Sequence, residues 1–307
     1  MFWGPWVPYF LRKKWGPGAV LVCCHITIRC QGRTCVLCMV VVECTPTRGG
    51  YMHVDVALGG SFVRLRGVGP NQGRERDYEH VRGPIRGFSK QSRKRYFDLF
   101  NSLDRQGPRP TLLLTLTYSD SSYGRSWQEC KADLRAFRSR FERRYGRVPY
   151  FWRLEHKPRQ SGQHVGQLMP HFHLLVFGQE RVDKDWLRGA WSEVVSNGAE
   201  LVRTNVRPVY DWRGAGCYLS KDLAKEQTTD VATGRVWGVV NKAVLFIRMV
   251  TVALSQLQFY KLRRALRGWL TRKLDRRLCW GKARGQGLTC YVDSDVGVRL
   301  LASLLQD

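Results

Sequence analysis

The stretch Pro170–Gly178 constrains the fold more than any other part of this sequence. It is a short, mostly apolar run that ends at a glycine, a pattern that predicts a buried β-strand. Side chains alternate along a strand, so His171 and His173 share one face while apolar residues fill the other. Two imidazoles on one face, about 6–7 Å apart, can ligate one divalent metal. The alternative is a pair of histidines bonded to neighbours at a sheet edge.

Two other segments have strand patterns that bear on these histidines. Thr111–Tyr118 alternates, and Tyr150–Glu155 sets Trp152 and Leu154 opposite Glu155. If the second of these strands joins the histidine strand in one sheet with helices on its apolar face, Glu155 meets both histidines on the open face. Two imidazoles and a carboxylate hold Mg²⁺ or Mn²⁺ with positions free for phosphate oxygens. His156 and His164 are rival candidates for the third ligand.

Helical patterns alternate with these strands. Ser126, followed by Glu129 as in a capping box, begins an amphipathic helix, and Asp183–Asn197 is a second helix. Leu201–Val209 is another strand candidate, and Tyr210–Lys225 predicts a turn followed by a helix. That helix sets Tyr218 and Lys221 on one face, where the lysine can favour a nucleophilic phenolate or bind a phosphate. The bland interpretation is a packing tyrosine beside a solvated lysine.

Charge indicates the class of partner. The 307 residues contain 51 Lys+Arg against 25 Asp+Glu, a formal charge of +26, and 12% of them are aromatic. This balance favours a polyanion, and the aromatic rings suit single-stranded nucleic acid. Thr251–Leu278 predicts a long amphipathic helix with a basic face, for which DNA contact and a membrane surface are the competing interpretations. No apolar run reaches the roughly 18–20 residues of a membrane span, so we expect no membrane insertion.

The first hundred residues have no sustained period. Tyr51–Val68 has the pattern of a hairpin, and the Gly/Arg-rich stretch from Gly67 to Arg95 predicts a flexible basic arm. Six of the ten cysteines lie between Cys23 and Cys44, where Cys30, Cys35, Cys38 and His25 are candidate zinc ligands. A paired CxxC is missing, which favours unpaired, buried thiols.

Three motifs occur in a fixed order: Leu114–Tyr118 (LTLTY), Pro170–His173 (PHFH) and Tyr218–Lys221 (YLSK). Together with Trp152–Glu155 (WRLE) and Gly234–Gly238 (GRVWG), they resemble the HUH endonuclease superfamily, and within it the rolling-circle replication initiators of small plasmids and filamentous phages. The resemblance covers roughly residues 111–238. It implies an α+β fold in which a central antiparallel sheet has helices on one face and the metal and tyrosine on the other.

The resemblance also implies an activity. Tyr218 would attack the phosphate of a single-stranded or hairpin origin, leaving a 5′-phosphotyrosine and a free 3′-OH, with Lys221 as its motif lysine. His171, His173 and Glu155 would bind the metal. We expect DNA contacts from further residues of the motifs and of the basic helix: Thr115, Thr117, Arg153, Lys225, Lys261, Arg263, Arg264 and Arg267.

The expected organisation has three parts. Residues 1–108 form a basic, poorly ordered N-terminal region, 109–240 the catalytic domain, and 241–307 a basic helical region. Such an initiator would act in the cytoplasm of a bacterial host with its helicase and polymerase. Asp222 stands where some relatives have a second tyrosine, so we predict a single-tyrosine enzyme. The alternatives are an HUH transposase or relaxase, and a non-catalytic basic nucleic-acid-binding protein.

Overall fold

The structure is a computed structural model. It describes residues 52–67, 83–212, 214–215, 227–228, 231–274, 288–291 and 294–305, and the backbone of three strands between 14 and 42. Its contacts divide the chain into two units, residues 78–248 and residues 1–77 together with 249–307. The three-part division expected from the sequence stays a prediction, because the described part of the N-terminal region lies in one unit with the C-terminal residues.

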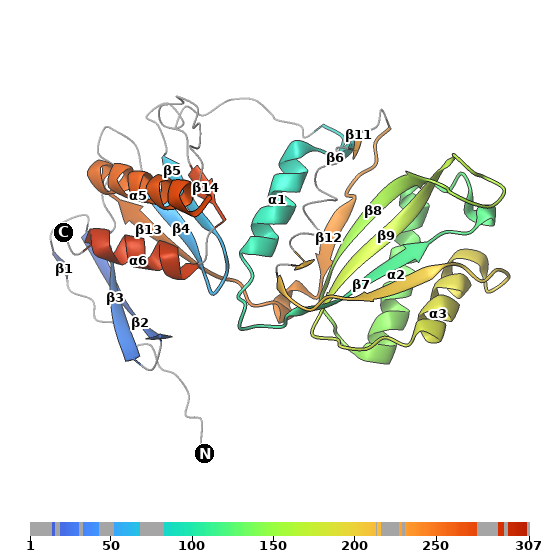
Figure 1. Cartoon of the computed structure of the whole chain (residues 1–307), viewed down its shortest axis with the longest axis horizontal. Coiled ribbons are helices and arrows are strands. Elements are labelled where there is room, and N and C mark those ends of the chain that lie inside the picture. The colour runs from blue at the N-terminus through green and yellow to red at the C-terminus, as the bar shows by residue number, and fades with distance from the viewer. Residues whose placement is uncertain are drawn as a thin grey trace, which may run out of the picture. The chain divides into compact units, whose positions relative to one another are not determined.

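A five-stranded antiparallel sheet is the centre of unit 78–248. Its strands lie in the order β10 (Thr204–Pro208), β7 (Pro110–Thr117), β9 (Leu168–Phe177), β8 (Tyr150–Pro158) and β12 (Trp237–Val240) (Figure 1). The histidine strand β9 is therefore central, and it is bonded to both other strands recognised from their alternation. This confirms the α+β class with a central antiparallel sheet.

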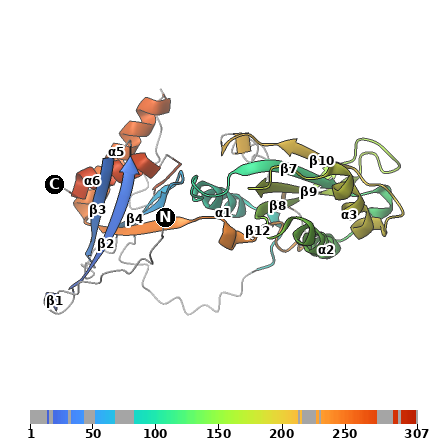
Figure 2. The ribbon, with the colours of Figure 1, turned by 90° about the horizontal axis from the view of Figure 1, so that it is seen from below.

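Two helices cover one face of this sheet, and they lie next to each other beside the strands (Figure 2). The first, α2 (Trp127–Tyr145), begins at the predicted capping box. Its Ser126 hydroxyl accepts from the Glu129 amide (3.2 Å), and the Ser126 amide donates to the Glu129 carboxylate (2.7 Å). The second, α3 (Lys184–Ser196), has Asp183 as N-cap. Their apolar residues bury the even-numbered side chains of the strands: Leu114, Leu116, Leu154, Phe172, Leu174 and Val176.

A third helix, α1 (Lys90–Asn101), packs against the opposite face and stands beside β12 (Figure 1). Tyr96 and Phe100 contact Phe151 edge-on, at ring-centroid distances of 5.3 and 6.3 Å. The flexible arm predicted for Gly67 to Arg95 is thus wrong from residue 87 onward. Ser89 caps the helix, and burial of these aromatic rings outweighs the high charge of the segment.

Several short elements complete this unit. They are β6 (Gly87–Phe88) paired with β11 (Gln227–Thr228), and the 3₁₀ turns η1 (Asp120–Ser122) and η2 (Lys242–Val244). Because α1 covers only the part of the second face around Phe151, Leu175 and Phe177, the part that carries the histidines has no helix over it among the described residues.

The other unit contains a four-stranded sheet in the order β13 (Arg248–Leu254), β4 (Met52–Leu58), β5 (Val63–Gly67) and β14 (Leu288–Cys290). Helices α5 (Gln256–Leu274) and α6 (Ser294–Leu305) pack with it around a core of valine, leucine and Phe259. The hairpin predicted for Tyr51–Val68 is confirmed as β4–β5. Strands β1 (Lys14–Trp15), β2 (Ala19–Cys30) and β3 (Arg33–Val42) form a separate sheet, and the proposed zinc ligands lie among side chains outside the described set.

The helix predicted for Thr251–Leu278 begins later than expected. Residues up to Leu254 belong to strand β13, in which Val252 and Leu254 are buried and alternate with exposed residues. Ser255 then starts α5 with a capping box, because its hydroxyl accepts from the Gln258 amide and Gln258 accepts from the Ser255 amide. The basic C-terminal helix itself is confirmed. No described helix is both long enough and apolar enough to cross a bilayer.

Candidate nuclease site

Strand register brings the predicted site residues together on the open face of the sheet. His171 lies opposite Glu155 on β8 and opposite Thr117 on β7. His173 lies opposite Arg153 and Thr115 in the same way. In an antiparallel pair, directly opposed residues project to the same face, so both histidines share it with the carboxylate and the threonines. The convergence of Glu155, His171 and His173 expected from alternation is what the backbone shows.

Glu155 is the electrostatic centre of this face. It is only 2% exposed, yet its carboxylate is 2.6 Å from Arg153 Nη1, 2.7 Å from Lys157 Nζ and 3.4 Å from His173 Nε2. Burial alone would raise its pKa, but His173, Arg153 and Lys157 together lower the pKa to about 2. The side chain is therefore ionised at every physiological pH.

His171 is held in a defined orientation. Its Nδ1 is 2.9 Å from the carbonyl oxygen of Met169, which can only accept, so Nδ1 carries the proton and Nε2 keeps its lone pair. Burial lowers the pKa of His171; the Met169 hydrogen bond opposes this effect, while His173 and Lys157 add to it. A neutral imidazole with a free Nε2 lone pair is the form that ligates metals.

His173 is oriented by groups on two neighbouring strands. Its Nδ1 is 3.4 Å from Thr115 Oγ1 on β7, and its Nε2 is 3.2 Å from Lys157 Nζ on β8. A lysine ammonium only donates, so Nε2 accepts from it and the Nδ1 proton is directed toward Thr115. Lys157 thus contacts the carboxylate and one imidazole simultaneously.

The donor set fits a divalent ion in its chemistry, since it combines two oriented imidazoles and an ionised carboxylate. Among the residues that the structure describes, however, no three His, Cys, Asp or Glu side chains are arranged as a metal cluster. The ammonium of Lys157 lies between Glu155 Oε2 and His173 Nε2 and neutralises the carboxylate there. A metal at these two atoms would take the position of that ammonium.

The two rival ligands are engaged elsewhere. His156 packs against Trp127 of α2, with ring centroids 4.0 Å apart, and burial lowers its pKa to about 4, with a smaller contribution from His171. His164, in the loop between β8 and β9, stacks on Tyr123 at 4.2 Å. Neither ring is among the groups that contact Glu155, which favours Glu155 over both as the third ligand.

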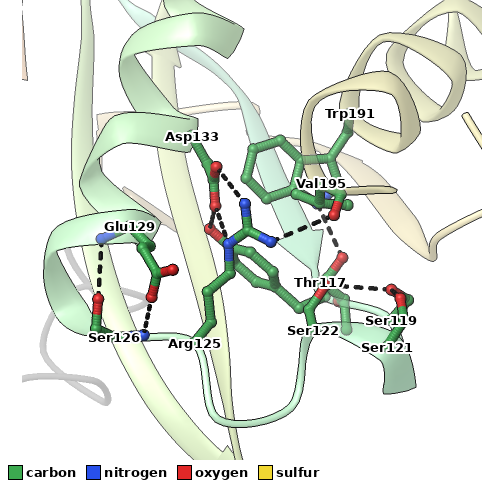
Figure 3. A network of polar contacts seen from close by, with 11 residues as sticks. Thr117, Ser119, Ser121, Ser122, Arg125, Ser126, Glu129, Asp133, Trp191 and Val195 are labelled. Atoms are coloured by element: carbon green, nitrogen blue, oxygen red, sulfur yellow. Dashed lines mark hydrogen bonds and ion pairs between the residues drawn. The ribbon is translucent and has the colours of Figure 1, made fainter. Parts of the chain in front are cut away.

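A polar network anchors the end of β7 next to these residues (Figure 3). The buried carboxylate of Asp133 accepts from the Tyr118 hydroxyl (2.8 Å) and from Arg125 (2.8 Å), which also reaches the Val195 carbonyl (3.4 Å). Trp191 of α3 donates to the Thr117 carbonyl at 2.8 Å. These bonds tie the strand end that carries Thr117 to both α2 and α3, and so hold the register of the site.

The predicted nucleophile lies outside the described residues, as do Lys221 and Lys225. The chain on either side of this segment is described. Ala215 is fully buried in the cluster that covers Phe151, Leu175 and Phe177 on the open face. Gln227 pairs with Phe88, whose ring lies 4.5 Å from the guanidinium carbon of Arg153. Both flanks of the segment 216–226 therefore attach to the same face as the histidines.

The predicted DNA contacts differ in exposure. Thr115 and Thr117 are half-buried on the open face, whereas Arg153 is buried against Glu155 and Phe88. On α5, Lys261 and Arg264 are exposed, while Arg263 and Arg267 are half-buried, the latter close enough to Cys290 for an electrostatic effect. The roles predicted for these residues stay predictions, and the exposed pair is the better placed for phosphate contact.

Lys157 was missed by sequence reasoning, although a signal for it existed. It follows Glu155 by two residues on β8, so strand alternation places it on the same face. Its contacts with Glu155 and His173 make it a central member of the site.

The comparisons with known proteins bear on the same segment. No curated protein and no solved structure matches the chain. The resemblance recognised in the motifs is nevertheless confirmed at the level of a family, because residues 111–227, which contain β7, β8 and β9, match the model of the replication-associated protein family of the ORF2 type.

Proposed function

We propose that this protein is a site-specific single-strand DNA endonuclease and strand transferase that initiates rolling-circle replication. The observation that carries the proposal is the open-face cluster of Glu155, His171 and His173, set by strand register within the segment that matches a replication-associated family. The net charge of +26 supports a nucleic acid as the substrate.

The proposed reaction exchanges one phosphodiester for another. The Tyr218 oxygen attacks the scissile phosphorus, the phenolic proton is lost, and the bond from phosphorus to the 3′ oxygen breaks. The products are a 5′-phosphotyrosine and a 3′-hydroxyl that primes synthesis. In the reverse direction, the 3′-hydroxyl of a completed strand attacks the phosphotyrosine and closes a circle. No net energy is required, because the number of phosphate ester bonds is conserved.

The described residues have separate parts in this scheme. His171, His173 and Glu155 would hold Mg²⁺ or Mn²⁺, which when bound would neutralise charge on the scissile phosphate. Arg153 and Thr115 orient Glu155 and His173. Lys157, the partly exposed cation of the cluster, is available for a phosphate oxygen when it leaves Glu155.

Chain length supports Tyr218 as the nucleophile. It follows the buried Ala215 by three residues, and an extended chain spans at most about 3.6 Å per residue, so the two Cα atoms are within about 11 Å of each other. Ala215 packs on the face that carries the histidines. Asp222 stands four residues after Tyr218, which supports a single-tyrosine enzyme whose second cleavage uses water, another group or another protomer.

The decisive experiment is a search for the covalent adduct. Labelled single-stranded oligonucleotides that tile the DNA encoding this chain are incubated with the protein and Mn²⁺ and separated under denaturing conditions. We expect an adduct on one oligonucleotide, its loss in Tyr218→Phe, and its retention in Tyr210→Phe, a control tyrosine that is 82% exposed. An adduct that persists in Tyr218→Phe would show that another residue is the nucleophile. Binding without any adduct would favour the non-catalytic DNA-binding alternative.

The metal is tested separately by binding. Isothermal titration with Mn²⁺ should give one site that is lost in His171→Ala and in His173→Ala. In Lys157→Met the Mn²⁺ affinity should rise, because no ammonium competes for Glu155 Oε2 and His173 Nε2. Full adduct yield in the presence of a chelator would remove the metal from the mechanism. The participation of a host helicase and polymerase is part of the same proposal and would be tested by reconstitution on a nicked origin.

A further inference from the structure

An exposed aromatic stack lies beside the candidate site and is not used by the proposed mechanism. Tyr123 and His164 lie face to face, with ring centroids 4.2 Å apart and an interplanar angle of 10°. Core ring pairs of the same unit, such as Tyr118 with Trp191, meet edge-on instead. Tyr123 is 49% exposed, so a large flat ring remains open to solvent. Exposed aromatic side chains of this kind occur at recognition surfaces.

The stack is held by polar contacts from two segments that are distant in the sequence. Asp120 of η1 is 2.9 Å from Arg159 Nε and accepts from the Gln163 amide at 3.3 Å. Arg159 also donates to the Tyr118 carbonyl at 2.9 Å, and the Tyr123 hydroxyl donates to Gln167 at 3.3 Å. Hydroxyls of Ser119, Ser121 and Ser122 bond one another in the turn that precedes Tyr123 (Figure 3). A ligand on this stack would therefore order little additional chain on binding.

The position of the stack relates it to the site. The loop that carries His164 joins the end of β8 to the start of β9, and Leu168 at that start is three residues before His171. Three residues of strand span about 10 Å. Tyr123 follows Thr117, the residue paired with His171, by six residues. Both rings thus belong to connections at the end of the sheet where His171 and Glu155 lie.

We infer that Tyr123 and His164 form a stacking platform for one nucleobase of the single strand whose phosphate is bound at the histidine cluster. The inference rests on the proposed function and adds a base-binding subsite to it. Stacking suits this occupant because every base has a π-face, and because Lys157 and Arg159 at the end of β8 supply cations for the adjoining backbone. The subsite would fix which phosphate reaches the nucleophile while remaining tolerant of base identity.

Binding of oligonucleotides with single abasic positions tests the platform. The measurements use fluorescence anisotropy and the Tyr218→Phe variant, which leaves the DNA intact. Tyr123→Ala should weaken binding of the full oligonucleotide by about 5- to 100-fold, as expected for one stacked base, whereas Tyr123→Phe should retain most of the affinity. Val165→Ala, at a 59% exposed position next to His164, is the matched control and should leave binding unchanged.

Two further outcomes decide between a platform and a structural role. With an abasic nucleotide at the stacked position, Tyr123→Ala should cost nothing more, whereas damage to the loop would weaken binding of every oligonucleotide equally and would overturn the inference. The dependence of affinity on salt should keep its slope, because no phosphate contact is lost. Unchanged affinity in Tyr123→Ala also overturns the platform but leaves the adduct intact. Loss of the adduct in the parent protein, with Tyr123-dependent binding preserved, would reject the nuclease proposal alone.

Discussion

Replacing Glu155 by glutamine tests the electrostatics of the site directly. The substitution keeps the size of the side chain and removes the negative charge that faces Arg153 and Lys157. Its pKa of about 2, against an ordinary value of 4.5, corresponds to roughly 3 kcal/mol of stability at neutral pH, at 1.36 kcal/mol for each factor of ten in proton affinity. Removal of one partner from a buried ion pair costs a similar amount, about 3–5 kcal/mol. We therefore expect Glu155→Gln to destabilise the sheet by roughly 3 kcal/mol.

The sign of the pH dependence follows from the lowered pKa. Because the folded chain holds Glu155 ionised more strongly than the unfolded chain does, the stabilisation is complete above about pH 4.5 and is lost as the pH falls toward 2. The difference between the parent protein and Glu155→Gln should be largest at pH 7 and shrink between pH 4.5 and pH 2.

Hydrogen exchange of the β8 and β9 amides, followed by mass spectrometry, measures this difference without requiring the two units to unfold together. The matched control is Glu180→Gln, which removes a carboxylate from an exposed pair with Arg109 at 3.4 Å and should cost less than about 1 kcal/mol. Equal effects of the two substitutions, or a Glu155→Gln effect that does not change down to pH 3, would refute the reasoning.

Two more predictions concern the fold and the basic helix. Asp133→Ala leaves the Tyr118 hydroxyl and Arg125 without their shared acceptor and should destabilise α2 by about 3 kcal/mol; in denaturation experiments, its effect should not add to that of Arg125→Ala, and strict additivity would contradict a coupled network. Neutralising the exposed Lys261 and Arg264 should lower the slope of log affinity against log salt by about 0.7–0.9 for each lost phosphate contact, more than Arg267→Ala does, and an unchanged slope would mean that α5 does not contact DNA.

Local patterns predicted much of the sheet. The period of two in Thr111–Tyr118, Tyr150–Glu155 and the histidine strand identified β7, β8 and β9, because each strand buries one face under helices. Ser126 and Glu129 marked the start of α2, since a capping box is a contact between residues three apart in the sequence. The same patterns put Glu155, His171 and His173 on one face.

Other local patterns were ambiguous and misled. The residues before Ser255 have apolar positions that suit both a strand and an extension of α5, and only pairing within the second sheet makes them β13. The helix α1 lies in a highly charged segment, and its few aromatic residues become significant only through burial against Phe151 of β8. Long-range packing overrode local composition in both places.

The sequence by itself determined which residues alternate to which face, because that depends on the geometry of a single strand. Only the tertiary structure decided which strands are neighbours, and therefore that Lys157 lies against both Glu155 and His173. It also decided that residues 52–67 join residues 249–305 in one unit. Such pairings depend on the balance of burial and loop closure over the whole chain, and no short stretch of sequence contains that information.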